Sequence, residues 1–185
     1  MTRLDPVDPT TATGKARTLL DAVQSNLGKI PNMMRTMALS PAVLEGYLGL
    51  NTALAGGVLN AHMREQIALA VAEVNRCGYC LAAHTHFGKQ IGLNADALER
   101  ARKATATDSK AAAALTFVRM LVEQHGTISD DDLRRVRQAG YGDAEIAEMI
   151  AHVALNIFTN YLNLVAQTEV DFPPVELHLG ARRAA

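Results

Sequence analysis

The chain has 185 residues, of which 49% are hydrophobic and 4% aromatic, and its formal net charge is −1. This length suits one domain, and the apolar content is too high for a disordered chain. The balanced charge, without a basic block, excludes an electrostatic footprint for nucleic acid. Two cysteines are too few for a disulfide scaffold or a four-cysteine zinc site.

The N-terminal segment 1–13 is polar and lacks the apolar core of a secretory signal. No stretch approaches the roughly 20 apolar residues that cross a bilayer. We therefore expect a cytoplasmic protein that contacts neither membrane nor nucleic acid. Thiols stay reduced in that compartment, so a close cysteine pair is more often catalytic, redox-sensing or metal-binding than structural.

Abundant alanine and leucine, without alternating β-branched runs, predict an all-α fold. We expect a compact bundle of about eight helices forming a single domain over residues 1–185. Its core spans 12–175, between a short polar N-terminus and a loosely ordered C-terminal tail. Ser40-Pro41 predicts one helix start, and Asn94 predicts the start of a short helix at 95–103. Thr107 or Asp108 is predicted to begin a helix that reaches His125 and is stopped by Gly126. A Ser129–Asp132 capping box is predicted to begin the next helix, which Gly140 ends.

The last and longest helix is predicted from Asp143 to about Gln167, before Phe172-Pro173-Pro174. Its helical spacing predicts one apolar face, formed by Ile146, Met149, Ile150, Val153, Ile157, Tyr161 and Leu164. A neighbouring polar stripe comprises His152, Asn156, Asn160 and Asn163. The stripe lines either a pocket or subunit interface, or consists of residues hydrogen-bonded at helix crossings, and we favour the second reading. Similar runs after Glu65 and Glu145 suggest a weak internal helical repeat.

Both cysteines lie in the segment 77–84, which reads Cys-Gly-Tyr-Cys-Leu-Ala-Ala-His. On a helix beginning near Cys77, the residues Cys77, Cys80 and His84 share one seam at i, i+3 and i+7, whereas His86 projects away. A thiol must lose its proton to attack, and His84, one turn after Cys80, can accept it. A second cysteine nearby can condense with a sulfenic acid to give a disulfide.

Three other interpretations of the pair are weaker. Inert core cysteines do not explain a histidine on the same seam. A zinc site would place four ligands on one helix with His86 pointing away, whereas structural zinc sites draw ligand pairs from separate segments. A thioredoxin-like motif follows a strand, and none is predicted. A carboxylate, Glu65 or Glu73, could complete a proton relay, and spacing alone does not choose between them.

The run Glu65-x11-Cys77-x-Tyr79-Cys80-x3-His84 resembles the AhpD-like alkylhydroperoxidases of the carboxymuconolactone decarboxylase superfamily. Segments 27–32, 40–42, 59–65 and 145–163 are also similar to this family, and the resemblance covers roughly 12–175. It implies an all-helical AhpD-like fold, a homo-oligomer (trimer or hexamer), and a peroxidase that needs no metal or cofactor beyond its redox-active disulfide. A hydroperoxide would be the substrate, and a dithiol or lipoyl-type reductant protein would restore the thiols.

The resemblance selects Glu65 over Glu73 as the acid of a relay with His84 and makes Cys77 and Cys80 the redox pair. Candidate supporting residues are Tyr79, Glu73 and His152. For Tyr79, a purely packing role is equally open. We assign Cys80 as the attacking thiol because it stands one turn from His84, and the reverse order remains open. Two other functions remain: a redox-sensing module switched by its disulfide, and a decarboxylase- or isomerase-like enzyme using Glu65 and His84.

Overall fold

The computed structural model describes residues 2–178, and these form helices without a strand. The all-α prediction is confirmed, with nine helices in the described part rather than about eight. They are α1 (Gly14–Leu27), α2 (Asn32–Met37), α3 (Pro41–Ala55), α4 (Ala61–Val74), α5 (Gly78–Gln90), α6 (Ala95–Arg102), α7 (Ser109–Glu123), α8 (Asp130–Gln138) and α9 (Asp143–Ala166).

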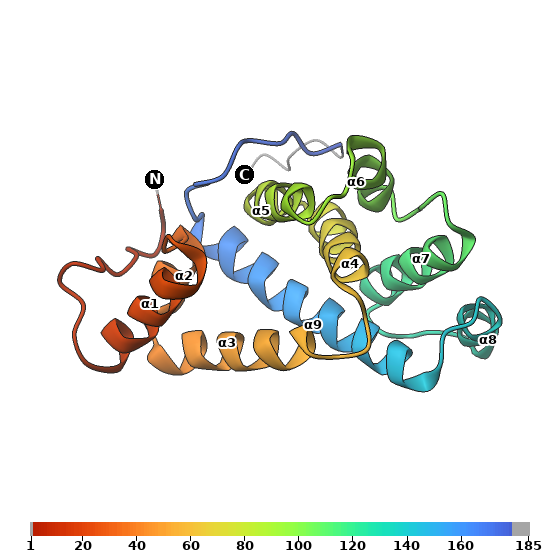
Figure 1. The fold of residues 1–185 in the computed structure, drawn as a ribbon, viewed down its shortest axis with the longest axis horizontal. Coiled ribbons are helices and arrows are strands. Elements are labelled where there is room, and N and C mark those ends of the chain that lie inside the picture. Colours follow the sequence, from red (N-terminus) through yellow and green to blue (C-terminus); the bar gives the residue numbers. More distant parts are fainter. Residues whose placement is uncertain (1, 179–185) are drawn as a thin grey trace.

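Helices α4 and α9 form the centre of the molecule (Figure 1). Helix α4 packs against α5, α6, α7 and α9, and the run 67–73 within it is entirely buried. Much of this run is alanine, whose small side chain lets neighbouring helices approach closely. The redox segment follows α4 directly, so it starts from the most buried part of the fold.

The helix starts confirm most of the predicted caps. Asn94, Asp108 and Ser129 each accept a hydrogen bond from a backbone N–H in the first turn that follows. Ser129 and Asp132 form the predicted capping box. Ser40 occupies the N-cap position before Pro41, but its side chain makes no capping hydrogen bond.

The predicted orientation of the last helix is partly wrong. Ile150, Tyr161 and Leu164, assigned to the buried apolar face, are exposed, whereas the whole polar stripe of His152, Asn156, Asn160 and Asn163 is buried. The physical reason is that α9 crosses the redox segment, where polar side chains find partners. For example, Asn160 accepts a hydrogen bond from Asn75 over 2.9 Å.

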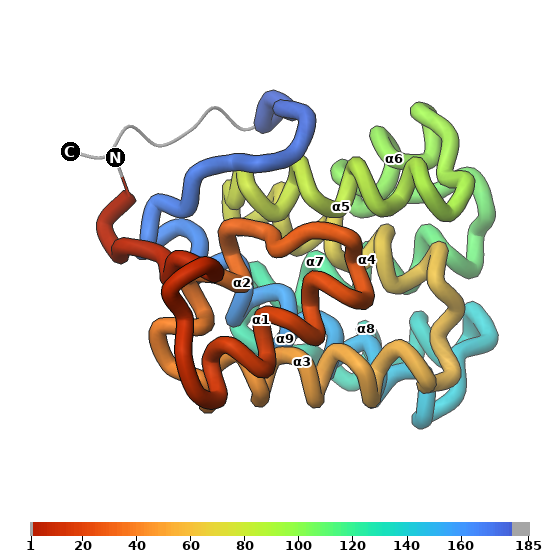
Figure 2. Tube along the Cα trace, turned by 60° about the vertical axis from the view of Figure 1, so that its left-hand side comes forward, coloured from red at the N-terminus to blue at the C-terminus, as the bar shows by residue number. Residues whose placement is uncertain are grey.

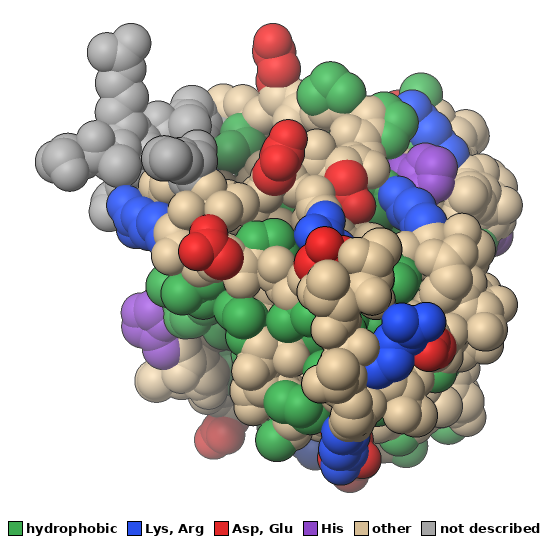
Figure 3. Space-filling model, turned by 90° about the vertical axis from the view of Figure 1, so that its left-hand side faces the viewer, with side chains coloured by type: hydrophobic (Ala, Val, Ile, Leu, Met, Phe, Trp, Pro, Cys, Tyr) green, Lys and Arg blue, Asp and Glu red, His purple; other side chains and the backbone are tan. Residues whose placement is uncertain are grey.

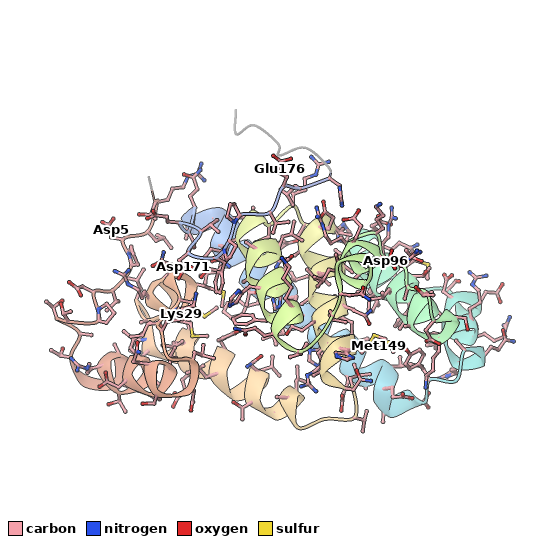
Figure 4. All side chains as sticks on the ribbon, turned by 45° about the horizontal axis from the view of Figure 1, so that its top comes forward. Asp5, Lys29, Asp96, Met149, Asp171 and Glu176 are labelled. Carbon is pink, nitrogen blue, oxygen red and sulfur yellow. The ribbon has the colours of Figure 1, made fainter. Side chains whose placement is uncertain are left out.

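Residues 176–178 of the predicted loose tail are held in place, and the remainder of that tail, 179–185, lies outside the described part. Segment 168–178 runs across α5 toward α6 (Figures 1 and 2). Its backbone is held by buried charges, since Glu73 accepts from the N–H of His178 and Arg102 donates to the carbonyl of Glu176. In Figure 4, Asp171 lies beside Lys29 and Glu176 lies farther along this segment, which we call the C-terminal strap.

Helix α9 is the one described helix whose length and hydropathy would allow it to cross a membrane. Half of its most apolar window is buried in the bundle, as expected for a core helix. On the face shown in Figure 3, acidic and basic side chains are mixed around hydrophobic ones. Helices α4 and α9, which contain the two similar runs after Glu65 and Glu145, pack against each other. That they form an internal repeat stays a prediction.

Candidate active site

The cysteine pair lies at a sharp turn between α4 and α5. Arg76 has a left-handed backbone (φ 58°), which ends α4 and lets Cys77 become the N-cap of α5. The Cys77 sulfur accepts a hydrogen bond from the backbone N–H of Cys80 over 3.3 Å. The predicted helix start near Cys77 is confirmed, and the two thiols lie on the first turn of α5, where the helix dipole favours negative charge.

Both cysteines are free thiols and are buried. The side-chain amide of Asn163 donates to the Cys80 sulfur over 3.3 Å. Burial alone would raise the pKa of Cys80, but hydrogen bonds from the Cys77 thiol and Asn163 and the positive charge of His84 lower it to about 7. The pKa of Cys77 is raised far above its usual value, chiefly because its thiol donates to Cys80. Of the two thiols, Cys80 is therefore the one that ionises near neutral pH, supported by a neutral Cys77.

His84 and Glu65 form a direct pair between α5 and α4. His84 Nδ1 lies 2.8 Å from Glu65 Oε2, and both side chains are about three-quarters buried. Burial would lower the pKa of His84, but the Glu65 carboxylate outweighs it, so the pKa is raised. The arrangement brings an acid, an imidazole and a thiolate to one place.

The second candidate carboxylate, Glu73, lies elsewhere. Its two oxygens accept hydrogen bonds from Arg102 (2.9 Å) and from the backbone of His178 (2.7 Å). The Glu73 and Arg102 side chains are buried, 5% and 10% exposed. Glu73 is a structural group that fixes the C-terminal strap, and the expectation that it might support the relay is not met.

Tyr79 uses its hydroxyl in a structural bridge. The hydroxyl donates to Asp171 on the strap (2.8 Å) and accepts from the backbone N–H of Met33 (3.1 Å). Burial raises the pKa of Tyr79, and the nearby Asp171 carboxylate raises it further. The surroundings of Tyr79 fit a packing role rather than a contribution of its hydroxyl to the chemistry.

A pocket of about 260 Å³ opens beside Cys80 and His84. Its wall is largely apolar, and Phe172 of the strap closes one side by packing edge-on against Tyr79 and Phe87. The pocket is also lined by His152 and Asn156, so part of the polar stripe has the pocket role that we ranked second. Tyr47 is another lining residue, and burial raises the pKa of its hydroxyl to about 12.

Several site residues have no signal in the sequence. Phe172 and Asp171 lie after the predicted end of the last helix, and they reach the site only because the strap folds back over α5. Arg64 was only part of a similar segment, yet it lines the pocket. His86 lies outside this lining and packs edge-on against Phe87 and at a tilt against Phe172, as its predicted projection away from His84 suggests. Within 2–178 no group of three or more His, Cys, Asp or Glu side chains is arranged to hold a metal ion.

Solved structures share this fold over most of the chain. A peroxidase-related protein from Ralstonia eutropha JMP134 with an alkylhydroperoxidase AhpD core is 20% identical, with a TM-score of 0.83 and 92% of each chain covered. A peroxidase-related protein from Silicibacter sp. TM1040 is 22% identical, with a TM-score of 0.78 and 97% and 98% covered. The debrominase Bmp8, as a cysteine-to-alanine variant bound to 2,3,4-tribromopyrrole, is 18% identical, with a TM-score of 0.78 and 92% of each chain covered.

Sequence comparison finds a family match over part of the chain. Residues 41–123, which contain the whole Glu65–His84 motif, match the carboxymuconolactone decarboxylase family. The matched stretch is less than half of the chain and is similar to that family, whereas the solved structures show that the fold is shared over most of the chain. An uncharacterised protein of Haemophilus influenzae is 51% identical over 45 residues, which are 24% of this chain and 40% of the relative. That match therefore spans less than half of either protein.

Proposed function

We propose that this protein is a thiol-dependent peroxidase that reduces hydroperoxides through Cys80 and Cys77. The observation that carries the proposal is the position of the Cys80 sulfur, which faces a largely apolar pocket. The pKa of this thiol is lowered to about 7, and the second thiol, Cys77, lies within one helical turn of it. A thiolate of that kind is nucleophilic near neutral pH. The AhpD-like fold supports a peroxidase-related role.

In the proposed first step, the Cys80 thiolate attacks the terminal oxygen of the hydroperoxide. A sulfur–oxygen bond forms, the oxygen–oxygen bond breaks, and the leaving alkoxide takes a proton from His84 and departs as an alcohol. Glu65 stabilises the imidazolium before this transfer. Cys80 is now a sulfenic acid.

In the second step, Cys77 loses its proton and attacks the Cys80 sulfur. A disulfide forms, and hydroxide leaves and is protonated to water. The two thiols have supplied two electrons to the peroxide. An external dithiol, which we propose to be small or lipoyl-like, then reduces the disulfide by exchange, so the cycle needs no other cofactor. A reducing compartment such as the cytoplasm would supply it.

We also propose that the chain forms a homo-oligomer. Ile150, Phe158, Tyr161 and Val165 are exposed along one side of α9, at 48%, 38%, 54% and 63%. No charged residue lies among them between 149 and 166. An uncharged stripe of this kind is typical of a protein interface. Sedimentation of Tyr161→Glu against wild type tests this, because a charge in the interface should give a smaller particle.

Steady-state turnover tests the peroxidase proposal. Reduced protein is assayed with cumene hydroperoxide and dihydrolipoamide, beside Cys80→Ser and Cys77→Ser. We expect each substitution to lower turnover at least a hundredfold, and full activity in both variants would refute the mechanism. 2,3,4-Tribromopyrrole is the competing substrate, because a debrominase has this fold. A disulfide that forms with peroxide and changes particle size, without turnover by any dithiol, would indicate a redox switch instead.

A further inference from the structure

Besides His84, two basic side chains line the pocket, Arg64 of α4 and His152 of α9, and the proposed relay uses neither. They lie near each other, since the positive charge of Arg64 acts on the His152 ring. Most of the remaining wall is apolar, including Met33, Met34, Leu155 and Phe172. Polar groups isolated in an apolar pocket usually fix the orientation of a ligand.

Arg64 is half-buried and has spare donors. Its Nη1 donates a hydrogen bond to the carbonyl of Leu59 over 2.6 Å. Neighbouring carboxylates are engaged elsewhere: Glu65 pairs with His84, and Glu148 accepts from the backbone N–H groups of Val58 and Leu59. No carboxylate of a described residue forms an ion pair with Arg64, although the charges of Arg64 and Glu148 act on each other, so the guanidinium keeps donors for a ligand in the pocket.

His152 is 5% exposed, and its Nε2 is buried without a hydrogen-bond partner among residues 2–178. A buried, unpaired ring nitrogen is costly, and most such groups in proteins find a partner. Burial, helped by the charge of Arg64, lowers the pKa of His152, so the ring is neutral at pH 7 and still carries one N–H donor.

We propose that Arg64 and His152 form a subsite for a carboxylate, and that the substrate is an apolar carboxylic acid bearing a hydroperoxide. A guanidinium binds a carboxylate through two parallel hydrogen bonds, and a neutral imidazole can donate a third. The apolar wall holds the body of the molecule, and its hydroperoxide group reaches Cys80. The hydroperoxide part rests on the proposed function, whereas the carboxylate part does not.

Binding tests the subsite without any chemistry. The probes are 4-isopropylbenzoate and 4-isopropylbenzamide, which share shape but differ in charge, titrated calorimetrically into reduced wild-type protein. We expect the acid to bind about tenfold more tightly, as charge-assisted hydrogen bonds predict. Arg64→Gln should remove this preference and Arg64→Lys should keep part of it. The matched control Arg119→Gln, on the exposed side of α7, should keep it fully.

Equal binding of acid and amide by wild type would overturn the subsite, and this comparison requires no variant to fold. A preference that survives in both Arg64→Gln and His152→Phe would also overturn it. Turnover then separates the two proposals. Cumene hydroperoxide carrying a para-carboxylate is compared with its methyl ester, and the ratio of their kcat/KM values should fall about tenfold in Arg64→Gln. Failure of both substrates in wild type, with the binding preference intact, would refute only the peroxidase proposal.

Discussion

The side-chain amide of Asn163 donates a hydrogen bond to the sulfur of Cys80 over 3.3 Å, joining residues 83 positions apart. The neighbouring Asn160 amide, whose Nδ2 has no partner by hydrogen-bond geometry among the described residues, also lowers the pKa of Cys80. Helix α9 therefore supplies buried amide donors to the sulfur that begins the proposed reaction. This contact explains why asparagines, rather than leucines, occupy the buried side of a core helix.

Replacing Asn163 with Leu should raise the pKa of Cys80, because the thiolate loses a donor while remaining buried. We expect about tenfold less thiolate at pH 7. Absorbance at 240 nm against pH measures the thiolate directly. Asn26→Leu, on the exposed side of α1, is the control. An unchanged titration in Asn163→Leu would show that the amide does not stabilise the thiolate.

Replacing Glu65 with Gln should lower the pKa of His84, since that pKa is raised by the carboxylate. A raised folded pKa adds stability below the unfolded value of about 6.5, and the contribution is lost as the pH rises through the folded pKa. Glu65→Gln should therefore lower Tm more at pH 6 than at pH 9.

The same variant should lower peroxide kcat/KM about a hundredfold, because the imidazolium loses its partner. Glu45→Gln, which breaks an exposed pair with Lys15, provides the comparison for both measurements. Equal Tm losses at the two pH values would contradict the assigned ion pair.

Replacing Glu73 with Gln should destabilise the fold and leave the cysteine chemistry intact. Arg102 would remain buried with only the longer, partly exposed contact to Glu99 (3.6 Å) as a countercharge, which costs up to about 3 kcal/mol. Urea unfolding gives the free energy, and the 240 nm titration of Cys80 should match wild type. A shifted thiol titration with unchanged stability would reverse the roles given to Glu65 and Glu73.

Replacing Tyr79 with Phe removes the bridge between Met33 and Asp171. We expect a loss of about 1–3 kcal/mol in unfolding free energy, since a buried N–H and a carboxylate lose a partner. The pH dependence of peroxide turnover should keep its shape. A new or missing limb in that profile would instead assign the hydroxyl a part in proton transfer.

The sequence predicted what depends on local spacing. Cys77, Cys80 and His84 lie within eight residues on one helix, so their shared face follows from helical geometry alone. The choice of Glu65 over Glu73 came from the family resemblance, and the structure pairs Glu65 with His84. Glu73 contacts Arg102 and the strap instead, and because α4 ends before α5 begins, helical spacing does not relate Glu73 to the cysteines.

Long-range packing accounts for what the sequence could not predict. The strap is bound to α5 by the hydrogen bond from Tyr79 to Asp171, which are 92 positions apart. A local sequence pattern does not predict a contact over that separation. The buried side of α9 was misassigned because helical periodicity shows that a helix has an apolar face but not which side packs against the other helices. The favoured interpretation of the polar stripe, residues hydrogen-bonded at helix crossings, describes Asn160 and Asn163, whose partners are Asn75 and the Cys80 sulfur.

A single turnover with one equivalent of cumene hydroperoxide, followed by mass spectrometry with the sulfenic-acid trap dimedone, tests the central claim most directly. Wild type should give a Cys77–Cys80 disulfide, Cys77→Ser should carry dimedone on Cys80, and Cys80→Ser should leave the peroxide unconsumed. Peroxide consumption by Cys80→Ser at the wild-type rate, or dimedone on Cys77, would contradict the assignment of Cys80 as the attacking thiol.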